Sequence, residues 1–301
     1  MSDDALVIEG VSKSYREVRA VQNLSARLPA GSIYGFLGPN GAGKTTTIRM
    51  IMDIIRPDSG SIRVLGQDSA ARARDRIGYM PEERGLYRKM KVRSMLAYLG
   101  AIKGMQRSEA ARAITAWLDE LGLSAWGGKK VEELSRGMQQ KLQFAATVIN
   151  DPELLILDEP FSGLDPLNLD LLKGIMLRLR ESGSTVIFST HMMEQAERLC
   201  DYLLLINKGE KVIDGTLGSI RAGFKSNAVS VELEGDPSFV GGLPMVSAVA
   251  RAGARLEAVL EPGADPQEFL KALVDKARVR AFEIKVPSLH EIFVSLVEEK
   301  K

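Results

Sequence analysis

A glycine-rich segment that ends in lysine and threonine is the first part of the chain whose residue types suggest chemistry. It contains Gly38, Pro39, Asn40, Gly41, Ala42, Gly43, Lys44, Thr45 and Thr46 and fits the pattern of a phosphate-binding loop. Glycines let successive backbone N–H groups turn toward phosphate oxygens, and a helix after the loop adds the positive end of its dipole. We expect Lys44 at the β and γ phosphates of a nucleotide and the Thr45 hydroxyl as a ligand of Mg²⁺. The alternative is a glycine-rich turn with an exposed lysine.

Two adjacent acids, Asp158 and Glu159, follow the apolar run 154–157 and precede a proline. A buried strand that ends in acids places their charge at the crevice where α/β sheets bind ligands. Neighbouring strand residues point to opposite sides, so the two acids should differ in task. We expect Asp158 in the Mg²⁺ shell, and we expect Glu159 to orient and deprotonate a water that attacks the γ phosphate. The alternative is a solvated strand end.

A third candidate segment, LSRGMQQ at 134–140, opens a predicted helix. Ser135 is placed as an N-cap, and this structural role is its simplest interpretation. The free N–H groups of a helix start also favour anions, so Ser135 and Gly137 could hold a phosphate with little side chain in the way.

The surrounding pattern supplies the elements that must position these residues. A strand at 32–38 precedes the glycine-rich loop, and apolar residues spaced by three and four predict a helix over 46–55. Helical spacing dominates 92–149, with a glycine break at 127–128. Runs at 154–157, 185–190 and 203–207 then alternate with helices near 167–180 and 192–199, as in a parallel sheet.

The pattern changes after residue 216, which predicts a second domain. Three segments alternate with the period of two typical of a half-buried sheet, at 229–235, 255–261 and 280–286. Two helices are expected, at 266–276 and 288–297. Ser288 with Glu291 three residues later predicts a capping box at the start of the last helix.

Composition narrows the class of protein. The 301 residues are 45% hydrophobic and carry 40 Lys and Arg against 39 Asp and Glu, so a net charge of +1 argues against non-specific binding to polyanions. The single cysteine, Cys200, allows no intramolecular disulfide, and the acidic start is unlike a secretory signal, so we expect a cytosolic chain. No apolar run nears the roughly 20 residues of a membrane span. Any membrane role should then come through a partner.

The order of the motifs resembles the ATP-binding cassette of ABC transporters over about residues 5–216. The resemblance rests on the phosphate loop, LSRGMQQ (134–140), LLILDEP (154–160), FSGLD (161–165) and STH (189–191). It implies an α/β fold of the P-loop NTPase type, a mixed sheet with an antiparallel β lobe plus a helical subdomain at about 88–150. The cassette would span 1–216, and a small accessory α+β domain would span 217–301.

The same resemblance implies roles for further residues. Two cassettes would form a head-to-tail dimer around two ATP molecules. The signature residues Ser135, Arg136, Gly137, Met138 and Gln139 would then act in trans on the γ phosphate, and Asp165 would cross the dimer interface. Tyr15 would stack on adenine, with ordinary core packing as the alternative. His191 would sense the γ phosphate and help hold the water, with a structural histidine as the alternative.

One position departs from the family pattern. Glu82 stands where most cassettes carry a glutamine that touches Mg²⁺ and the water. A carboxylate is a stronger Mg²⁺ ligand than an amide but adds charge beside phosphates and two other acids, so Glu82 joins Thr45 and Asp158 as an expected metal ligand. The segment EERGLY (82–87) resembles the corresponding segment in a branch of exporters that includes sodium-efflux cassettes. Segment 85–92 is the expected docking place for a cytoplasmic helix of the permease, with an ordinary loop as the alternative.

These features together predict the ATP-hydrolysing subunit of an ABC transporter of the exporter type. It would bind ATP and Mg²⁺, pair with an identical or second cassette, and work on the inner face of the cell membrane through a separate permease, without nucleic acid. A ribosome- or DNA-associated cassette is the first alternative, although such proteins usually carry two cassettes or a long coiled coil. A regulatory module that binds ATP without hydrolysis is the second, and Glu159 and His191 disfavour it.

Overall fold

The computed structural model describes residues 4–83, 85–224, 227–253 and 255–298. The chain divides into two compact units, Met1–Leu217 and Gly218–Lys301, and each is described by itself. The sequence predicts the boundary between 216 and 217, and the division lies one residue further on.

The first unit is built on a six-stranded sheet in the order β5, β6, β7, β3, β8, β9. The strands are β3 (Ile33–Leu37), β5 (Ile77–Met80), β6 (Leu154–Asp158), β7 (Thr185–Thr190), β8 (Tyr202–Asn207) and β9 (Glu210–Thr216). Neighbours are parallel except for β8 and β9, which are antiparallel. Strands β3, β6 and β7 are buried along their whole length, as expected for a parallel sheet covered on both faces. The carboxyl ends of these three strands therefore meet at one edge.

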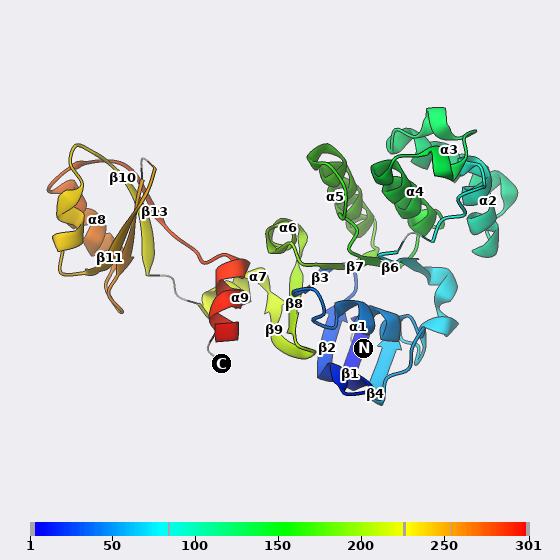
Figure 1. The fold of residues 1–301 in the computed structure, drawn as a ribbon, viewed down its shortest axis with the longest axis horizontal. Helices are drawn as coiled ribbons and strands as arrows, with labels where there is room; N and C mark the ends of the chain where they lie inside the picture. The colour runs from blue at the N-terminus through cyan, green and yellow to red at the C-terminus, as the bar shows by residue number, and fades with distance from the viewer. Residues whose placement is uncertain (1–3, 84, 225–226, 254, 299–301) are drawn as a thin grey trace. The chain divides into compact units, whose positions relative to one another are not determined.

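Both faces of this sheet are covered (Figure 1). On one face, α5 (Pro166–Glu181) packs on β7, α6 (Met193–Leu199) on β3 and α4 (Arg136–Val148) on β5. On the other face lie α1 (Lys44–Ile51) and the antiparallel sheet of β2 (Val18–Pro29), β1 (Asp4–Tyr15) and β4 (Ser59–Val64). Side chains from the two sheets and α1, among them Phe36 and Ile48, form one buried hydrophobic cluster. This core packs α1 against β2, β4 and β6.

A helical subdomain follows β5. It consists of α2 (Val92–Ile102), α3 (Arg107–Glu120) and α4, with short 3₁₀ turns at Ser124–Trp126 and Val131–Glu133. Ala110, Ile114 and Leu118 are buried on one face of α3, which confirms the helical spacing predicted for this part of the chain. Two more 3₁₀ turns, Ala70–Arg72 and Arg74–Arg76, lead into β5.

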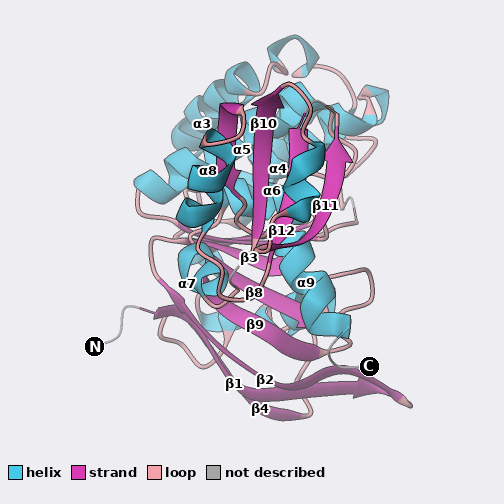
Figure 2. Ribbon diagram, turned by 90° about the vertical axis from the view of Figure 1, so that its left-hand side faces the viewer, coloured by secondary structure: helices cyan, strands magenta, loops and turns pink. Residues whose placement is uncertain are grey.

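The second unit is an α+β fold around an antiparallel sheet in the order β11, β12, β10, β13, whose strands Figure 2 shows side by side. The strands are β10 (Ala228–Glu234), β11 (Val246–Ala252), β12 (Arg255–Leu260) and β13 (Arg278–Ile284), and the helices are α7 (Leu217–Ala222), η5 (Ser238–Gly242), α8 (Pro266–Val274) and α9 (Leu289–Glu298). Phe269 and Leu273 of α8 join the core of this sheet. The predicted capping box is present, since Ser288 N–H donates to Glu291 Oε2 over 2.8 Å and Glu291 N–H donates to Ser288 Oγ over 3.2 Å.

Helix α1 is shorter than the sequence predicts. The apolar spacing predicts a helix over 46–55, whereas α1 begins at Lys44 and ends at Ile51. Asp53 adopts a left-handed backbone with φ of 57°, and this conformation cannot continue the helix. Ile55 still packs against the core from the turn, which explains why its spacing imitates a helical position.

Candidate functional site

The glycine-rich loop lies where the sequence predicts it, between a buried strand and a helix. Strand β3 ends at Leu37, and α1 begins at Lys44. Gly38 has φ of 149°, and a Cβ there would lie 2.1 Å from the backbone oxygen of Ile206. Gly43 has φ of 108°, and a Cβ there would lie 2.4 Å from the backbone oxygen of Ala20. Only glycine fits both positions, so the loop's shape depends on these two residues.

A cavity of about 530 Å³ opens at this loop. Glu82 and Glu159 line this cavity together with the loop, although both are distant from the loop in sequence. The cavity is lined by Val18, Arg19, Ala20, Asn40, Gly41, Ala42, Gly43, Lys44, Thr45, Thr46, Glu82, Glu159 and Lys208. The lining therefore contains most of the predicted nucleotide-binding residues.

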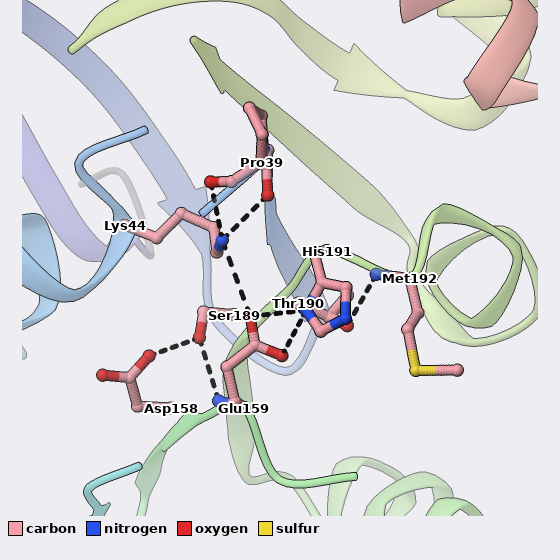
Figure 3. Close-up of polar contacts among 9 residues, drawn as sticks. Pro39, Lys44, Asp158, Glu159, Ser189, Thr190, His191 and Met192 are labelled. Atoms are coloured by element: carbon pink, nitrogen blue, oxygen red, sulfur yellow. Dashed lines mark hydrogen bonds and ion pairs between the residues drawn. The ribbon is translucent and has the colours of Figure 1, made fainter. Parts of the chain in front are cut away.

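Lys44 is the buried cation of this cavity, with only 6% of the residue exposed. Its Nζ donates to the carbonyl oxygens of Gly38, over 2.8 Å, and Pro39, over 3.2 Å. The same Nζ lies 3.5 Å from Glu159 Oε1 (Figure 3). The ammonium group is thus held between the loop carbonyls and a carboxylate, at the place where the loop meets the cavity.

Asp158 ends β6 and is 1% exposed. Its Oδ1 accepts a hydrogen bond from Ser189 Oγ, whereas Oδ2 is buried and has no hydrogen-bond partner among the described residues. A buried carboxylate oxygen without a partner is costly, and a bound cation would satisfy it. The described residues form no cluster of three or more His, Cys, Asp or Glu. Mg²⁺ is commonly bound by one or two carboxylates together with phosphates and water. Asp158 and the half-buried Thr45 fit this donor set.

Glu159 follows Asp158 in a left-handed backbone conformation with φ of 50°. Its N–H donates to Ser189 Oγ over 3.0 Å, and the residue is 9% exposed. His191 Nδ1 lies 3.2 Å from Oε1 and 3.1 Å from Oε2 of Glu159. An ionised carboxylate only accepts hydrogen bonds, so this contact is a hydrogen bond in the tautomer that carries the proton on Nδ1. Glu159 is therefore contacted by Lys44 on one side and by His191 on the other.

Comparison with protein-family models finds the ABC transporter model over residues 21–162. The uncharacterized ABC transporter ATP-binding protein YhaQ of Bacillus subtilis (strain 168) is 42% identical to this chain over 295 residues, which cover 97% of this chain and 98% of that protein. The chain belongs to the family of ABC transporter ATP-binding proteins.

Further matches extend to the second unit. Residues 215–297 match the C-terminal domain model of DrrA1-3-like ATP-binding proteins. The daunorubicin/doxorubicin resistance ATP-binding protein DrrA of Streptomyces peucetius is 32% identical over 305 residues, which cover 97% of this chain and 92% of that protein. The Nod factor export ATP-binding protein I of Rhizobium sp. (strain N33) is 36% identical over 301 residues, which cover 98% of each chain.

A solved structure described as an ATP-binding subunit of an ABC transporter superposes with a TM-score of 0.69 and 30% identity, over 73% of this chain and 93% of that one. ABC ATP-binding subunits bind and hydrolyse ATP, dimerise and work with membrane permeases. This chain is accordingly an ATPase subunit of an ABC transporter. Among the helices of the described residues, none combines the length and the hydropathy that a membrane span requires.

The signature segment of this cassette lies at the start of α4. Ser135 is the N-cap, as predicted, and its Oγ accepts from Met138 N–H over 3.3 Å. Ser135 and Arg136 are exposed, and Gly137, Met138 and Gln139 are half-buried. Gln139 Nε2 donates to the carbonyl oxygen of Leu134 over 3.0 Å. None of these residues is among the described residues that line the cavity at Lys44, so one chain does not bring the two motifs together.

Helix α4 also contacts both acidic segments of the cassette. Gln140 Nε2 donates to the carbonyl oxygen of Pro160 over 3.0 Å, directly after Glu159. Gln143 Nε2 donates to the carbonyl oxygen of Pro81 over 2.8 Å, directly before Glu82. One helix therefore links the signature end to the segments that carry Glu82 and Glu159.

Two further predicted residues lie apart from the cavity. Asp165 is the exposed N-cap of α5, and hydrogen bonds from the backbone N–H of Asn168, over 3.0 Å, and its side-chain amide, over 2.6 Å, lower the pKa of Asp165. Tyr15 stands at the end of β1 and is 46% exposed, with Lys13 Nζ 5.8 Å from the ring centre. That exposure shows the core-packing alternative for Tyr15 to be wrong, although Tyr15 is not among the described residues that line the cavity.

Ser189 is one of the site residues that the sequence does not reveal; Val18, Arg19, Ala20 and Lys208 in the cavity lining are others. Ser189 belongs to the quoted STH motif, but no role follows from that motif. Its position depends on register, because β6 and β7 pair so that Asp158 stands opposite Ser189. Strand register between distant segments cannot be read from the sequence alone.

Proposed function

We propose that this chain is the nucleotide-binding subunit of an exporter, and that it hydrolyses ATP at the cavity beside the phosphate-binding loop. The observation that carries the assignment of the site is the position of the Glu159 carboxylate, 3.5 Å from Lys44 Nζ and 3.1 Å from His191 Nδ1. An acid between a phosphate-binding lysine and a proton-carrying histidine can accept a proton from water beside a bound phosphate.

The proposed roles follow from chemistry at each atom. Loop N–H groups and Lys44 bind the phosphates, while Glu159 takes a proton from the attacking water and His191 orients that carboxylate. Thr45 and Asp158 would hold Mg²⁺, which supplies charge neutralisation at the phosphates when bound. Glu82 lines the same cavity and is the third proposed ligand. Water attacks the γ phosphorus, the bond to the β-phosphate oxygen breaks, and ADP and phosphate leave.

The signature residues Ser135 to Gln139 are proposed to act on ATP bound to a second cassette, with Asp165 at the interface. Two observations support this arrangement. The signature residues are not among the described residues that line the cavity at Lys44 of the same chain, and Ser135 and Arg136 at the start of α4 are exposed. Backbone N–H groups at a helix start suit an anion such as the γ phosphate. A head-to-tail pair, of identical or different cassettes, would complete two such sites, with Tyr15 beside the adenine.

A second cavity of about 280 Å³ is the proposed contact for the permease. It lies between β5 and the helices α2 and α4 and is lined by Met52, Arg74, Ile77, Gly78, Tyr79, Pro81, Gly85, Leu86, Leu99, Ile102, Lys103, Gln143, Ala146 and Thr147. Gly85 and Leu86 belong to the segment in which docking is expected. A mostly apolar hollow of this size accepts the side chains of a short helix. The chain would then sit at the inner face of the membrane through its partner.

Export as the direction of transport is supported by the full-length relatives named for Nod factor export and for drug resistance. The match of the second unit to a DrrA-like C-terminal domain supports the same branch. These names describe other proteins, so the cargo of this chain is left open.

Co-purification from membranes tests the proposal. The tagged chain should recover one polytopic membrane protein, and ATP hydrolysis should rise when both are reconstituted in a bilayer. Leu86→Asp should abolish recovery but leave the ATPase activity of the isolated chain, because Leu86 lines the second cavity and not the one at Lys44. Leu167→Asp, on the 81% exposed side chain at the start of α5, is the matched control. Equal recovery with both variants would contradict the proposed contact.

A further inference from the structure

Ser189 is the penultimate residue of β7 and is fully buried. Its hydroxyl contacts two neighbouring residues of β6 and the turn that follows (Figure 3). It donates to Asp158 Oδ1 and accepts from the backbone N–H of Glu159 over 3.0 Å. A serine hydroxyl has one proton to donate, so the donation to Asp158 fixes the proton and leaves the lone pairs for Glu159.

The first contact controls the orientation of Asp158. The last torsion of an aspartate is broad and nearly two-fold, so a carboxylate without a partner can turn. Because Ser189 binds Oδ1, the other oxygen is fixed in direction. That oxygen, Oδ2, is the buried atom that has no partner among the described residues. Hydrogen bonds of this kind commonly orient metal-binding carboxylates.

The second contact controls the backbone of Glu159. A φ of 50° is uncommon for a residue with a side chain and persists only where neighbours hold it. The Glu159 N–H stands past the end of β6, where Ser189 Oγ supplies its acceptor. The left-handed turn directs the carboxylate toward Lys44 and His191, as Figure 3 shows.

We propose that Ser189 is a positioning residue for ATP hydrolysis. Its hydroxyl fixes both the direction of Asp158 Oδ2 and the backbone conformation of Glu159. The cation-binding carboxylate and the general base therefore keep fixed positions relative to each other. This inference rests on the proposed function, because it takes the roles of Asp158 and Glu159 from there. Ser189 is not among the described residues that line the cavity at Lys44, and its hydroxyl acts through its contacts to Asp158 and Glu159.

The chain offers a matched control on the same strand. Thr185 begins β7, is 2% exposed, and its Oγ1 accepts from the backbone N–H of Gly31 over 2.9 Å. It is likewise a buried hydroxyl bonded to a backbone N–H, but it contacts neither acid. Loss of Thr185 should lower stability without a specific effect on the chemistry.

The experiment compares Ser189→Ala, Ser189→Thr and Thr185→Val in the full chain, with ATP hydrolysis measured over a range of Mg²⁺ concentrations. We expect Ser189→Ala to lower kcat, or to raise the Mg²⁺ concentration for half-maximal activity, by about 10- to 100-fold. ATP binding without Mg²⁺ should change less than about twofold, because Lys44 and the loop are untouched. Ser189→Thr, which keeps the hydroxyl, should recover most of the activity. Thr185→Val should leave kcat and the Mg²⁺ dependence at wild-type values.

Three results would overturn the proposal. These are wild-type kcat and Mg²⁺ dependence in folded Ser189→Ala, an equal loss in Thr185→Val, or failure of Ser189→Thr to recover activity while it binds ATP normally. If Ser189→Ala does not fold, Ser189→Cys replaces it, since a thiol keeps the volume but is a weak donor. Full activity of that variant would then refute the inference.

Glu159→Gln separates this inference from the proposed function. Wild-type hydrolysis by Glu159→Gln would reject the catalytic assignment itself. An inactive Glu159→Gln beside a fully active Ser189→Ala would reject only the positioning role.

Discussion

Replacement of Glu159 by glutamine gives the most direct check of the site. The two side chains have the same shape, so the substituted amide can still accept the hydrogen bond from His191, and the backbone contact to Ser189 is unchanged. What disappears is the group that can take a proton. A positioned general base contributes about 10²- to 10⁴-fold to rate, which corresponds to roughly 3–5 kcal/mol in the barrier.

The same substitution also changes charge inside the cavity. At 3.5 Å, the attraction between Lys44 and Glu159 amounts to roughly 4–5 kcal/mol at an effective dielectric constant of about 20. Part of this is offset, because the amide does not carry the desolvation cost of a buried carboxylate, but Lys44 is left as a buried charge without its ionic partner. We therefore expect a loss of about 3–5 kcal/mol in stability, or a fall of about 6–20 °C in Tm for a unit of this size. The freed Lys44 charge should also strengthen the retention of ATP.

We would measure single-turnover hydrolysis, ATP binding and thermal melting on the same samples. These measurements check both the expected loss of rate and the expected loss of stability. Glu153→Gln is the matched control, since Glu153 is an exposed acid paired with Arg76 outside the cavity. We expect Glu159→Gln to bind ATP, to accumulate as a nucleotide-bound dimer in size-exclusion chromatography, and to hydrolyse at least about 100-fold more slowly. A rate within about tenfold of wild type would refute the assignment of Glu159 as the base.

Three other substitutions extend the test. Lys44→Ala should abolish ATP binding in equilibrium titrations, because a buried cation is removed from the loop, and wild-type affinity would contradict its role at the phosphates. Glu82→Gln should preserve hydrolysis if an amide suffices there, whereas loss of activity that higher Mg²⁺ restores would show that the carboxylate binds the ion. Hydrogen bonds from Asn168 lower the pKa of Asp165, so its contribution to stability is present above the unfolded pKa of about 3.9 and is lost as pH falls through the lower folded value. The difference in Tm between wild type and Asp165→Ala should therefore narrow as the pH falls below about 4, and a constant difference would contradict this.

The parts of the site that follow from local chemistry could be predicted from the sequence. The loop requires glycine at 38 and 43 because a Cβ there would clash with backbone atoms. The glycines of the sequence motif already indicate this requirement. An apolar run followed by two acids likewise predicts a buried strand with charge at its end. Both features depend on neighbours in sequence, and the structure has them where they are expected.

Features that depend on pairing between distant segments could not be predicted. Strand β9 is an edge strand whose residues are half-buried or exposed, and β5 has only four residues, so neither gives a clear periodic pattern. The role of Ser189 depends on its register with Asp158 across two strands. The contacts of Gln140 and Gln143 depend on how α4 lies against the sheet, which its amphipathic pattern leaves open.

Helix α4 connects the signature segment at Ser135 to the segment around Pro81 at the second cavity. Its 13 residues make a rod of about 20 Å, with Ser135 at one end and Gln143 midway along it, bonded to Pro81 in the wall of the second cavity. If such a rod tilts by about 10° around its far end, the tip moves by about 3.5 Å, which exceeds the length of a hydrogen bond. A small displacement of the segment around Pro81 is therefore enough to make or break a contact at Ser135, without any change in the helix itself.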